Sequence, residues 1–299
     1  MPVHEGTGEY STSQLGRNDL FNLSGMVSVV TGGGTGIGLM IAQGLSANGA
    51  KVYIVGRRQE VLEKAVKEHE GVGQMIALVG DTTDKESIQS LVKDLSEKES
   101  YIDLLVNNAG VAGDMLDENM DTKNFGSVYD ALWNQTFETT SQILTTNVLG
   151  YYYTAVGFLP LLHKSTSANT GYSAQILNVT SNASFGKMPM NNCIYSASKA
   201  ASTHLSKMLA TLLADSKIRS NVLAPGLYPS EMTAGDSNEN NQSNLGKDQF
   251  GMEIPAGRAG TTPEMAATAV FMASKANTYM NGSVVMTDGG VLLKMPSVF

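Results

Sequence analysis

Apolar residues gather in short runs that alternate with longer amphipathic stretches from Gly25 onward. Most runs are nearly continuous and β-branched, which is typical of strands covered by helices on both faces. They predict strands over Met26–Val30, Val52–Val55, Met75–Val79, Ile102–Val106, Ile176–Val179, Ile218–Leu223 and Val284–Met286. The intervening stretches predict helices over Ile37–Asn48, Gln59–His69, Lys85–Glu97, Phe137–Leu162, Ile194–Ala214 and Pro263–Ser274. This alternation predicts an α/β fold with a doubly wound parallel sheet.

Three segments do not follow this alternation. Residues 1–22 are polar and are interpreted as an N-terminal extension of a single domain over 23–299. Residues 111–136 are polar and irregular, and 228–254 contain a run rich in Asn, Ser, Gly and Asp. Both stretches are consistent with solvated loops or with loops that line a substrate site.

Composition and charge exclude several classes of protein. With 42% hydrophobic residues, the 299-residue chain can bury a sizeable core. The net charge of -8 and the absence of a basic stripe argue against nucleic acid as a partner. No apolar run reaches the roughly 18 residues of a membrane span, and the N-terminal residues lack a signal core, so we expect a cytoplasmic protein. Cys193 has no disulfide partner, and no metal-ligand spacing is present.

A glycine-rich turn follows the first predicted strand and opens the first long helix, over Thr31–Gly38. Glycines allow a tight turn and let a pyrophosphate approach the first amides of the helix. The strand–turn–helix context favours a dinucleotide site over a plain tight turn. No Lys-Ser/Thr pair follows the glycines, which disfavours a nucleotide-hydrolysing loop.

The second predicted strand ends in Gly56-Arg57-Arg58. A carboxylate in this place would bind the ribose 2′-hydroxyl of NAD, whereas an arginine suits the 2′-phosphate of NADP. We therefore expect NADP(H), the alternative being that both arginines belong to a solvated helix start.

Candidate chemistry lies in two further places. Tyr195 and Lys199 are four residues apart, so they share one face of a predicted helix. A nearby ammonium would favour the phenolate form of Tyr195 and lower its pKa. Ser181 lies at the carboxyl end of a predicted strand, where ligands of such sheets gather, although a capping role is the alternative.

Together these motifs resemble the classical short-chain dehydrogenase/reductase family over about Leu23–Leu292. The resemblance rests on Thr31–Gly38, Asp81-Thr82, Asn107–Gly110, Asn147–Gly150, Ser181, Tyr195–Lys199, Pro225-Gly226, Ile254–Arg258, Pro263-Glu264 and Asp288–Gly290. It implies a single Rossmann-like domain. The Pro225–Thr233 segment and the Ser–Tyr interval are most similar to the rhamnolipid-type β-ketoacyl reductase branch.

The resemblance implies a catalytic tetrad of Asn147, Ser181, Tyr195 and Lys199. Tyr195 would exchange a proton with the substrate oxygen, Lys199 would lower its pKa and hold the nicotinamide ribose, Ser181 would polarise the carbonyl, and Asn147 would anchor a water. The implied cofactor contacts are Gly32, Thr35, Gly36, Ile37, Gly38, Arg57, Arg58, Asp81, Thr82, Asn108, Ala109, Gly110, Tyr195, Lys199, Pro225, Gly226, Tyr228 and Ser230.

Three departures from the family pattern matter. Ser181 precedes Tyr195 by one residue more than the commonest family spacing, with Ser184 as the fallback. Thr35 stands where NADP-using members often carry a basic residue. The stretch between Asn108 and Asn147 is longer than usual, which argues against a simple fatty-acid role.

We therefore predict an NADP(H)-dependent oxidoreductase that interconverts a ketone and a secondary alcohol, with Tyr195 as general acid/base. Its partner would be a small carbonyl or alcohol substrate, without nucleic acid, membrane or metal, and family habit implies a homodimer or homotetramer. The alternatives are an enzyme of secondary metabolism acting on a polyketide or alkaloid, with or without net redox, and a non-catalytic dinucleotide-binding regulator. The run Tyr151–Tyr153 is interpreted as core and subunit contact rather than as a substrate box.

Overall fold

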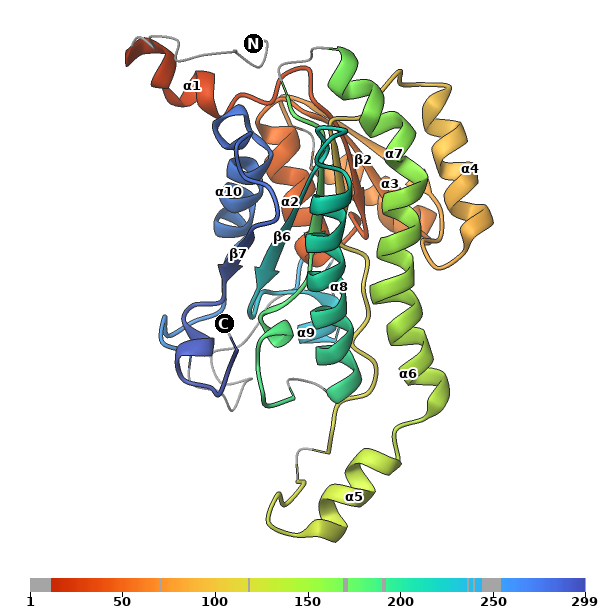
Figure 1. The fold of residues 1–299 in the computed structure, drawn as a ribbon, viewed down its shortest axis with the longest axis vertical. Helices are drawn as coiled ribbons and strands as arrows, with labels where there is room; N and C mark the ends of the chain where they lie inside the picture. The colour runs from red at the N-terminus through yellow and green to blue at the C-terminus, as the bar shows by residue number, and fades with distance from the viewer. Residues whose placement is uncertain are drawn as a thin grey trace.

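Seven parallel strands form one sheet in the computed structural model (Figure 1), which describes residues 12–69, 71–117, 119–168, 172–189, 192–235, 237–238, 240–243 and 254–298. The strand order is β3-β2-β1-β4-β5-β6-β7. The strands are β1 (Val27–Thr31), β2 (Lys51–Gly56), β3 (Gln74–Val79), β4 (Leu104–Asn107), β5 (Gln175–Val179), β6 (Arg219–Pro225) and β7 (Val284–Thr287). The predicted Rossmann-like sheet is confirmed, and the order reverses between β1 and β4, where such sheets bind ligands.

Helices cover both faces of the sheet, which explains the continuous apolar runs. One core contains side chains of α2 (Gly36–Ala47), α3 (Gln59–Glu68) and α10 (Thr262–Ala273). The opposite core contains side chains of α4 (Lys85–Ser96), α7 (Tyr151–Ala168) and α8 (Cys193–Leu212). Within β1, Val30 packs in the first core and Val29 in the second, so both sides of the strand are covered.

The helix predicted over Phe137–Leu162 is divided in the structure. It consists of α6 (Phe137–Leu144), the π-helical segment η2 (Thr145–Gly150) and α7, which continues to Ala168. A π turn inserts an extra residue into the helical repeat and often marks a functional site. Here η2 carries Asn147, whose side chain is fully buried.

The two predicted loops contain helices that their polar composition concealed. Residues 111–136 include α5 (Phe125–Trp133), which begins where the Asn124 side chain accepts hydrogen bonds from the Gly126 and Ser127 amides. The expectation of an irregular stretch is therefore wrong for α5, because a local cap, rather than apolar periodicity, starts this helix. Residues 228–254 include α9 (Glu231–Ala234), while 236, 239 and 244–253 lie outside the described residues.

The remaining elements are short. They are α1 (Arg17–Leu20) and the 3-10 turns η1 (Thr12–Leu15), η3 (Asn182–Ser184), η4 (Lys275–Asn277) and η5 (Val291–Leu293). Of the extension predicted over 1–22, residues 1–11 lie outside the described part of the chain. None of the helices in the described ranges combines the length and apolarity needed to cross a bilayer.

Candidate active site

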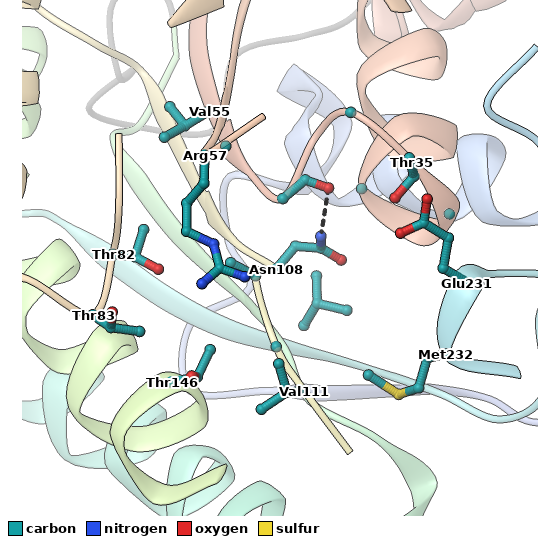
Figure 2. Close-up of a pocket in the computed structure, with 18 of the residues that line it drawn as sticks. Thr35, Val55, Arg57, Thr82, Thr83, Asn108, Val111, Thr146, Glu231 and Met232 are labelled. Carbon is teal, nitrogen blue, oxygen red and sulfur yellow. Dashed lines mark hydrogen bonds between the residues drawn. The ribbon is translucent and has the colours of Figure 1, made fainter. Parts of the chain in front are cut away.

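A cavity of about 690 Å³ lies where the strands end at the switch between β1 and β4. Its walls come from the glycine turn, the ends of β2 and β3, the segment after β4, helix α8 and the start of α9. Figure 2 shows Arg57 and Thr82 on one side of this cavity and Glu231 and Met232 on the other. The volume is within the usual range for small-molecule and cofactor sites. The described residues contain no cluster of His, Cys, Asp or Glu suited to a metal ion.

The glycine turn is shaped by close backbone packing. Gly32 and Gly36 have positive φ angles of 64° and 52°, a conformation that residues with a Cβ rarely adopt. A Cβ on Gly38 would overlap the Gly32 carbonyl oxygen and Asn108 Nδ2. Asn108 in turn donates hydrogen bonds from Nδ2 to Thr31 O (3.0 Å) and Gly32 O (3.2 Å). The turn is thereby held open at the N-terminus of α2, where amides and the helix dipole favour an anion.

Most of the cofactor contacts implied by the resemblance lie together in this cavity. Its lining includes Gly32, Thr35, Gly36, Ile37, Gly38, Arg57, Arg58, Asp81, Thr82, Asn108, Ala109, Gly110, Tyr195, Lys199 and Ser230. Pro225, Gly226 and Tyr228 are outside that lining. The ring of Tyr228 instead contributes to a second cavity of about 250 Å³, beside Arg258 and Glu264.

The two arginines after β2 differ in their surroundings. Arg57 extends into the cavity between Thr82 and Asn108 (Figure 2). Arg58 forms an ion pair with Glu231, with 2.8 Å between Arg58 Nη2 and Glu231 Oε2. The sequence analysis missed Glu231, since nothing local relates it to an arginine 173 residues away.

Tyr195 is positioned by the first turn of α8. The N-cap residue Asn192 accepts a hydrogen bond from the Tyr195 amide at 2.6 Å. The Asn192 Nδ2 group donates to Ala112 O and to Asp114 O, each at 2.8 Å. This asparagine therefore fastens the start of α8 to the chain after β4. Asn is a strong N-cap residue, so the position of Asn192 just before the predicted helix was the sequence signal by which this role could have been found.

Tyr195 is buried, and burial raises the pKa of its phenol, while a hydrogen bond with the Ser181 side chain acts in the opposite direction. The expected lowering of the Tyr195 pKa is therefore not found in the protein by itself, because loss of hydration outweighs that bond. The neutral phenol is the form that can donate a proton. Ser184, the fallback, instead accepts a hydrogen bond from Thr203 Oγ1 at 3.2 Å.

Lys199 lines the cavity together with Tyr195, and oxygen atoms surround its ammonium group. Its Nζ atom is 3.3 Å from Val179 O, 3.4 Å from the Tyr151 hydroxyl and 5.9 Å from the centre of the Tyr195 ring. Burial lowers the Lys199 pKa to about 8. The Tyr151 hydroxyl donates to Val179 O at 2.7 Å, and burial raises its pKa above the ordinary phenol value. Sequence reasoning missed this contact of Tyr151.

Asn147 contacts backbone on the inner side of the cavity wall. Its Oδ1 accepts from the Val111 amide and its Nδ2 donates to Val111 O, both at 2.9 Å. The Asn147 carbonyl accepts from Ser202 Oγ at 2.6 Å. Asn147 thus holds the segment after β4 against α8, with its side chain outside the cavity lining.

Comparisons with known proteins agree with this arrangement. The family model described as enoyl-(acyl carrier protein) reductase matches residues 32–292. The chain is 42% identical to the short-chain dehydrogenase/reductase PhomF of Diaporthe leptostromiformis, over 96% of this chain and 98% of that protein. It is 35% identical to the rhamnolipids biosynthesis 3-oxoacyl-[acyl-carrier-protein] reductase of Pseudomonas aeruginosa, over 90% of this chain and 97% of that protein. The structure of Pseudomonas aeruginosa RhlG in an NADP active-site complex superposes with a TM-score of 0.77 at 32% identity, covering 91% and 98% of the two chains.

Proposed function

Because the chain belongs to the short-chain dehydrogenase/reductase family of oxidoreductases, we propose that it interconverts a ketone and a secondary alcohol with NADP(H). The observation that carries this proposal is that Tyr195 and Lys199 line the cavity that also contains the glycine turn and Arg57. Ser181 lies beside Tyr195, through the hydrogen bond described above. A proton donor, a buried ammonium and an anion site in one cavity suit carbonyl reduction by a dinucleotide.

The cavity residues fit a phosphorylated dinucleotide. Without a Cβ, Gly38 lets the start of α2 pack directly against the Gly32 carbonyl and the Asn108 amide. The first amides of α2, which begins in this turn, would then bind the pyrophosphate. Arg57 would bind the 2′-phosphate, since a guanidinium recognises phosphate through charge and paired hydrogen bonds. Bound NADP(H) would supply or accept the hydride.

The remaining steps belong to the chain itself. In the reduction, Tyr195 would donate its hydroxyl proton to the carbonyl oxygen, and Ser181 would orient that oxygen by a hydrogen bond. The Lys199 ammonium would stabilise the tyrosinate left behind, because opposite charges at this separation attract strongly in a buried site. Val111 and Met232 contribute apolar surface to the cavity, which suits a substrate with an apolar portion next to the carbonyl.

A reductase assay tests the proposal. NADPH oxidation would be followed spectroscopically over a panel of ketones, including 3-oxoacyl thioesters and bulky cyclic ketones. We expect Tyr195→Phe to lower kcat by at least about 100-fold, since a general acid contributes roughly that much or more. Tyr152→Phe, on the exposed side of α7, is the matched control and should retain activity.

Two results would contradict the proposal. Tyr195→Phe retaining most of the activity would exclude the phenol as the proton donor. NADPH binding without turnover of any carbonyl in the panel would favour the dinucleotide-binding regulator. The buried pair of Tyr195 and Lys199 favours an enzyme instead, since a regulator does not need it.

A further inference from the structure

A segment after β6 lies across the phosphate-binding side of the cavity. This segment, here called the strap, comprises residues 230–235, 237–238 and 240–243. Asn241, which is buried and has a φ of 55°, donates from Nδ2 to Gly34 O (3.2 Å) and to Val61 O (3.0 Å). His69 Nε2 lies within hydrogen-bond distance of Asn240 O. The strap is therefore attached to the glycine turn and to α3, the elements next to the arginines.

Glu231 connects this strap to Arg58. One carboxylate oxygen of Glu231 pairs with Arg58, and the other accepts from Ser237 Oγ at 2.9 Å. Both members of the ion pair are partly exposed at 54% and 32% of their side-chain surface, so the pair is weak and readily exchanged. Both also line the cavity. Among the described residues Arg57 has no such acidic partner within ion-pair distance.

The 2′-phosphate of NADP(H) and the Glu231 carboxylate are both oxyanions, and a guanidinium binds either of them through charge and paired hydrogen bonds. Arg58 can neutralise one of them fully, and the phosphate carries the larger charge. NAD(H) has a neutral hydroxyl at that position and leaves the ion pair intact. Glu231 would therefore weaken the binding of the phosphorylated cofactor and leave the binding of NAD(H) unchanged.

We propose that Glu231 is a cofactor-selecting residue that competes with the 2′-phosphate of NADP(H) for Arg58. This inference rests on the proposed function. When the phosphate binds Arg58, the strap would lose one of its attachments to the β2–α3 side of the cavity and keep those made by Asn241.

Binding measurements on purified protein test this competition. The dissociation constants of NADPH and NADH would be measured by cofactor fluorescence for wild type, Glu231→Gln and the control Glu60→Gln. Glu60 is an exposed carboxylate in the first turn of α3 and outside the cavity lining. We expect Glu231→Gln to bind NADPH roughly two- to fivefold more tightly, the range of an exposed ion pair, with NADH binding unchanged. Glu60→Gln should match wild type.

The same substitution in an Arg58→Ala background isolates the mechanism. Competition requires Arg58, so the gain in NADPH affinity should disappear there. A gain that persists without Arg58, or equal changes for both cofactors, would overturn the proposal. Wild type binding NADPH no more tightly than NADH would instead refute the cofactor preference in the proposed function.

A second observation concerns the opposite end of the molecule. The segment 115–137, with residue 118 outside the described part and here called the arm, carries α5 and projects beyond the sheet and its helices (Figure 1). None of the residues of α5 is buried. Phe125, Tyr129 and Trp133 form a ladder along one side, with ring centres 6.3 and 6.0 Å apart. The Phe137 side chain, at the start of α6, is 88% exposed.

The arm exposes a large apolar surface for a monomeric protein. A nine-residue helix is marginal in water without packing. The large apolar side chains of the arm expose on the order of 800 Å², which is the contribution of one partner to a standard interface and exceeds ordinary surface patches. They are Met115, Phe125, Tyr129, Leu132, Trp133 and Phe137.

We infer that the arm packs against a second copy of this chain. In a dimer with a two-fold axis each copy presents the same patch, so the two patches together would bury the surface area that is usual for a stable dimer interface. The ladder repeats every four residues, so two ladders can interdigitate along their length, and Asp130 is the one charged residue in α5.

The single tryptophan of the chain, Trp133, provides a direct probe. We expect light scattering to show an oligomer whose Trp133 emission shifts to longer wavelength on dilution. The double variant Phe125→Ser/Phe137→Ser should shift association to at least tenfold higher concentration and show the solvated emission throughout. Leu293→Ser, an exposed leucine outside the arm, is the control. Circular dichroism and NADPH binding would confirm that the variants fold.

Three outcomes would overturn this inference. They are a wild-type monomer, an oligomer that the arm variant leaves unchanged, and emission that shifts only when phosphatidylcholine vesicles are added. The last would assign the arm to a lipid surface.

Discussion

The hydroxyl oxygen of Tyr151 lies 3.4 Å from the Nζ atom of Lys199, and both groups contact the carbonyl oxygen of Val179. Tyr151 begins α7 immediately after the π-helical segment, and Lys199 lies on α8. A buried ammonium retains its charge only when nearby oxygen atoms replace its hydration. The Tyr151 hydroxyl is one of those oxygen acceptors, which makes Tyr151 a positioning residue for Lys199.

Tyr151→Phe tests this contact. Removing the hydroxyl takes an acceptor from the ammonium, so the pKa of Lys199 should fall further below its value of about 8. Because the proposed reaction uses charged Lys199, activity should decline with rising pH, and the decline should begin at lower pH in the variant. We expect kcat at pH 7 to fall about three- to tenfold, the range of one ordinary intramolecular hydrogen bond. The pH profile of Tyr152→Phe should match wild type, and an unchanged profile for Tyr151→Phe would remove Tyr151 from this role.

Lys199→Met should stabilise the fold at neutral pH while abolishing activity. The Lys199 pKa is about 8 in the folded protein and near 10.4 when unfolded, so the unfolded chain binds the extra proton between these values. The free energy of unfolding of the wild type therefore rises with pH across that window, and the cost of burying the charge is fully present below it. Removing the charge should raise the free energy of unfolding by on the order of 2 kcal/mol at pH 7.

Urea unfolding at pH 7 and pH 9.5 would measure this effect. The advantage of Lys199→Met should shrink at the higher pH, where the wild-type side chain is largely neutral in the folded state. Lys207→Met, on the exposed side of α8, should show neither the gain nor its pH dependence. A loss of stability in Lys199→Met at pH 7 would contradict the argument.

Gly38→Ala should remove cofactor binding. The added methyl group would overlap the Gly32 carbonyl and the Asn108 amide, so the turn must open or α2 must shift. We expect NADPH affinity to fall more than tenfold and the free energy of unfolding to fall by about 2 kcal/mol, as for overpacking of a closed site. Fluorescence titration and urea unfolding measure the two effects. Gly126→Ala in the exposed helix α5 should preserve both quantities, and Gly38→Ala binding NADPH normally would refute this view of the turn.

Asn147→Asp probes the link between η2 and the segment after β4. The aspartate oxygen cannot donate to Val111 O, so a buried carbonyl loses its partner and faces another acceptor. The melting temperature should fall, corresponding to roughly 2 kcal/mol or more, and the loss should be larger at neutral than at acidic pH, where a protonated carboxyl can donate. Asn134→Asp at the exposed end of α5 is the control. Equal stability of Asn147→Asp and wild type would show that the Val111 contacts are dispensable.

Much of the fold follows from local patterns in the sequence. The strand β2 and the helix α8 lie within two residues of their predicted ends, because apolar runs and N-terminal signals act over a few residues. The helix α5 was not predicted because it has no buried face. The π turn at Asn147 was not predicted because its apolar pattern differs little from that of a continuous helix.

The sequence by itself determined the strand–helix alternation, the glycine turn and the four-residue interval between Tyr195 and Lys199. Each depends on residues close together in the chain, where backbone sterics and helical periodicity set the geometry. Only the tertiary structure decided which groups surround them. Tyr151 reaches Lys199 across 48 residues and Glu231 reaches Arg58 across 173, and such contacts depend on how the helices and the strap pack on the sheet.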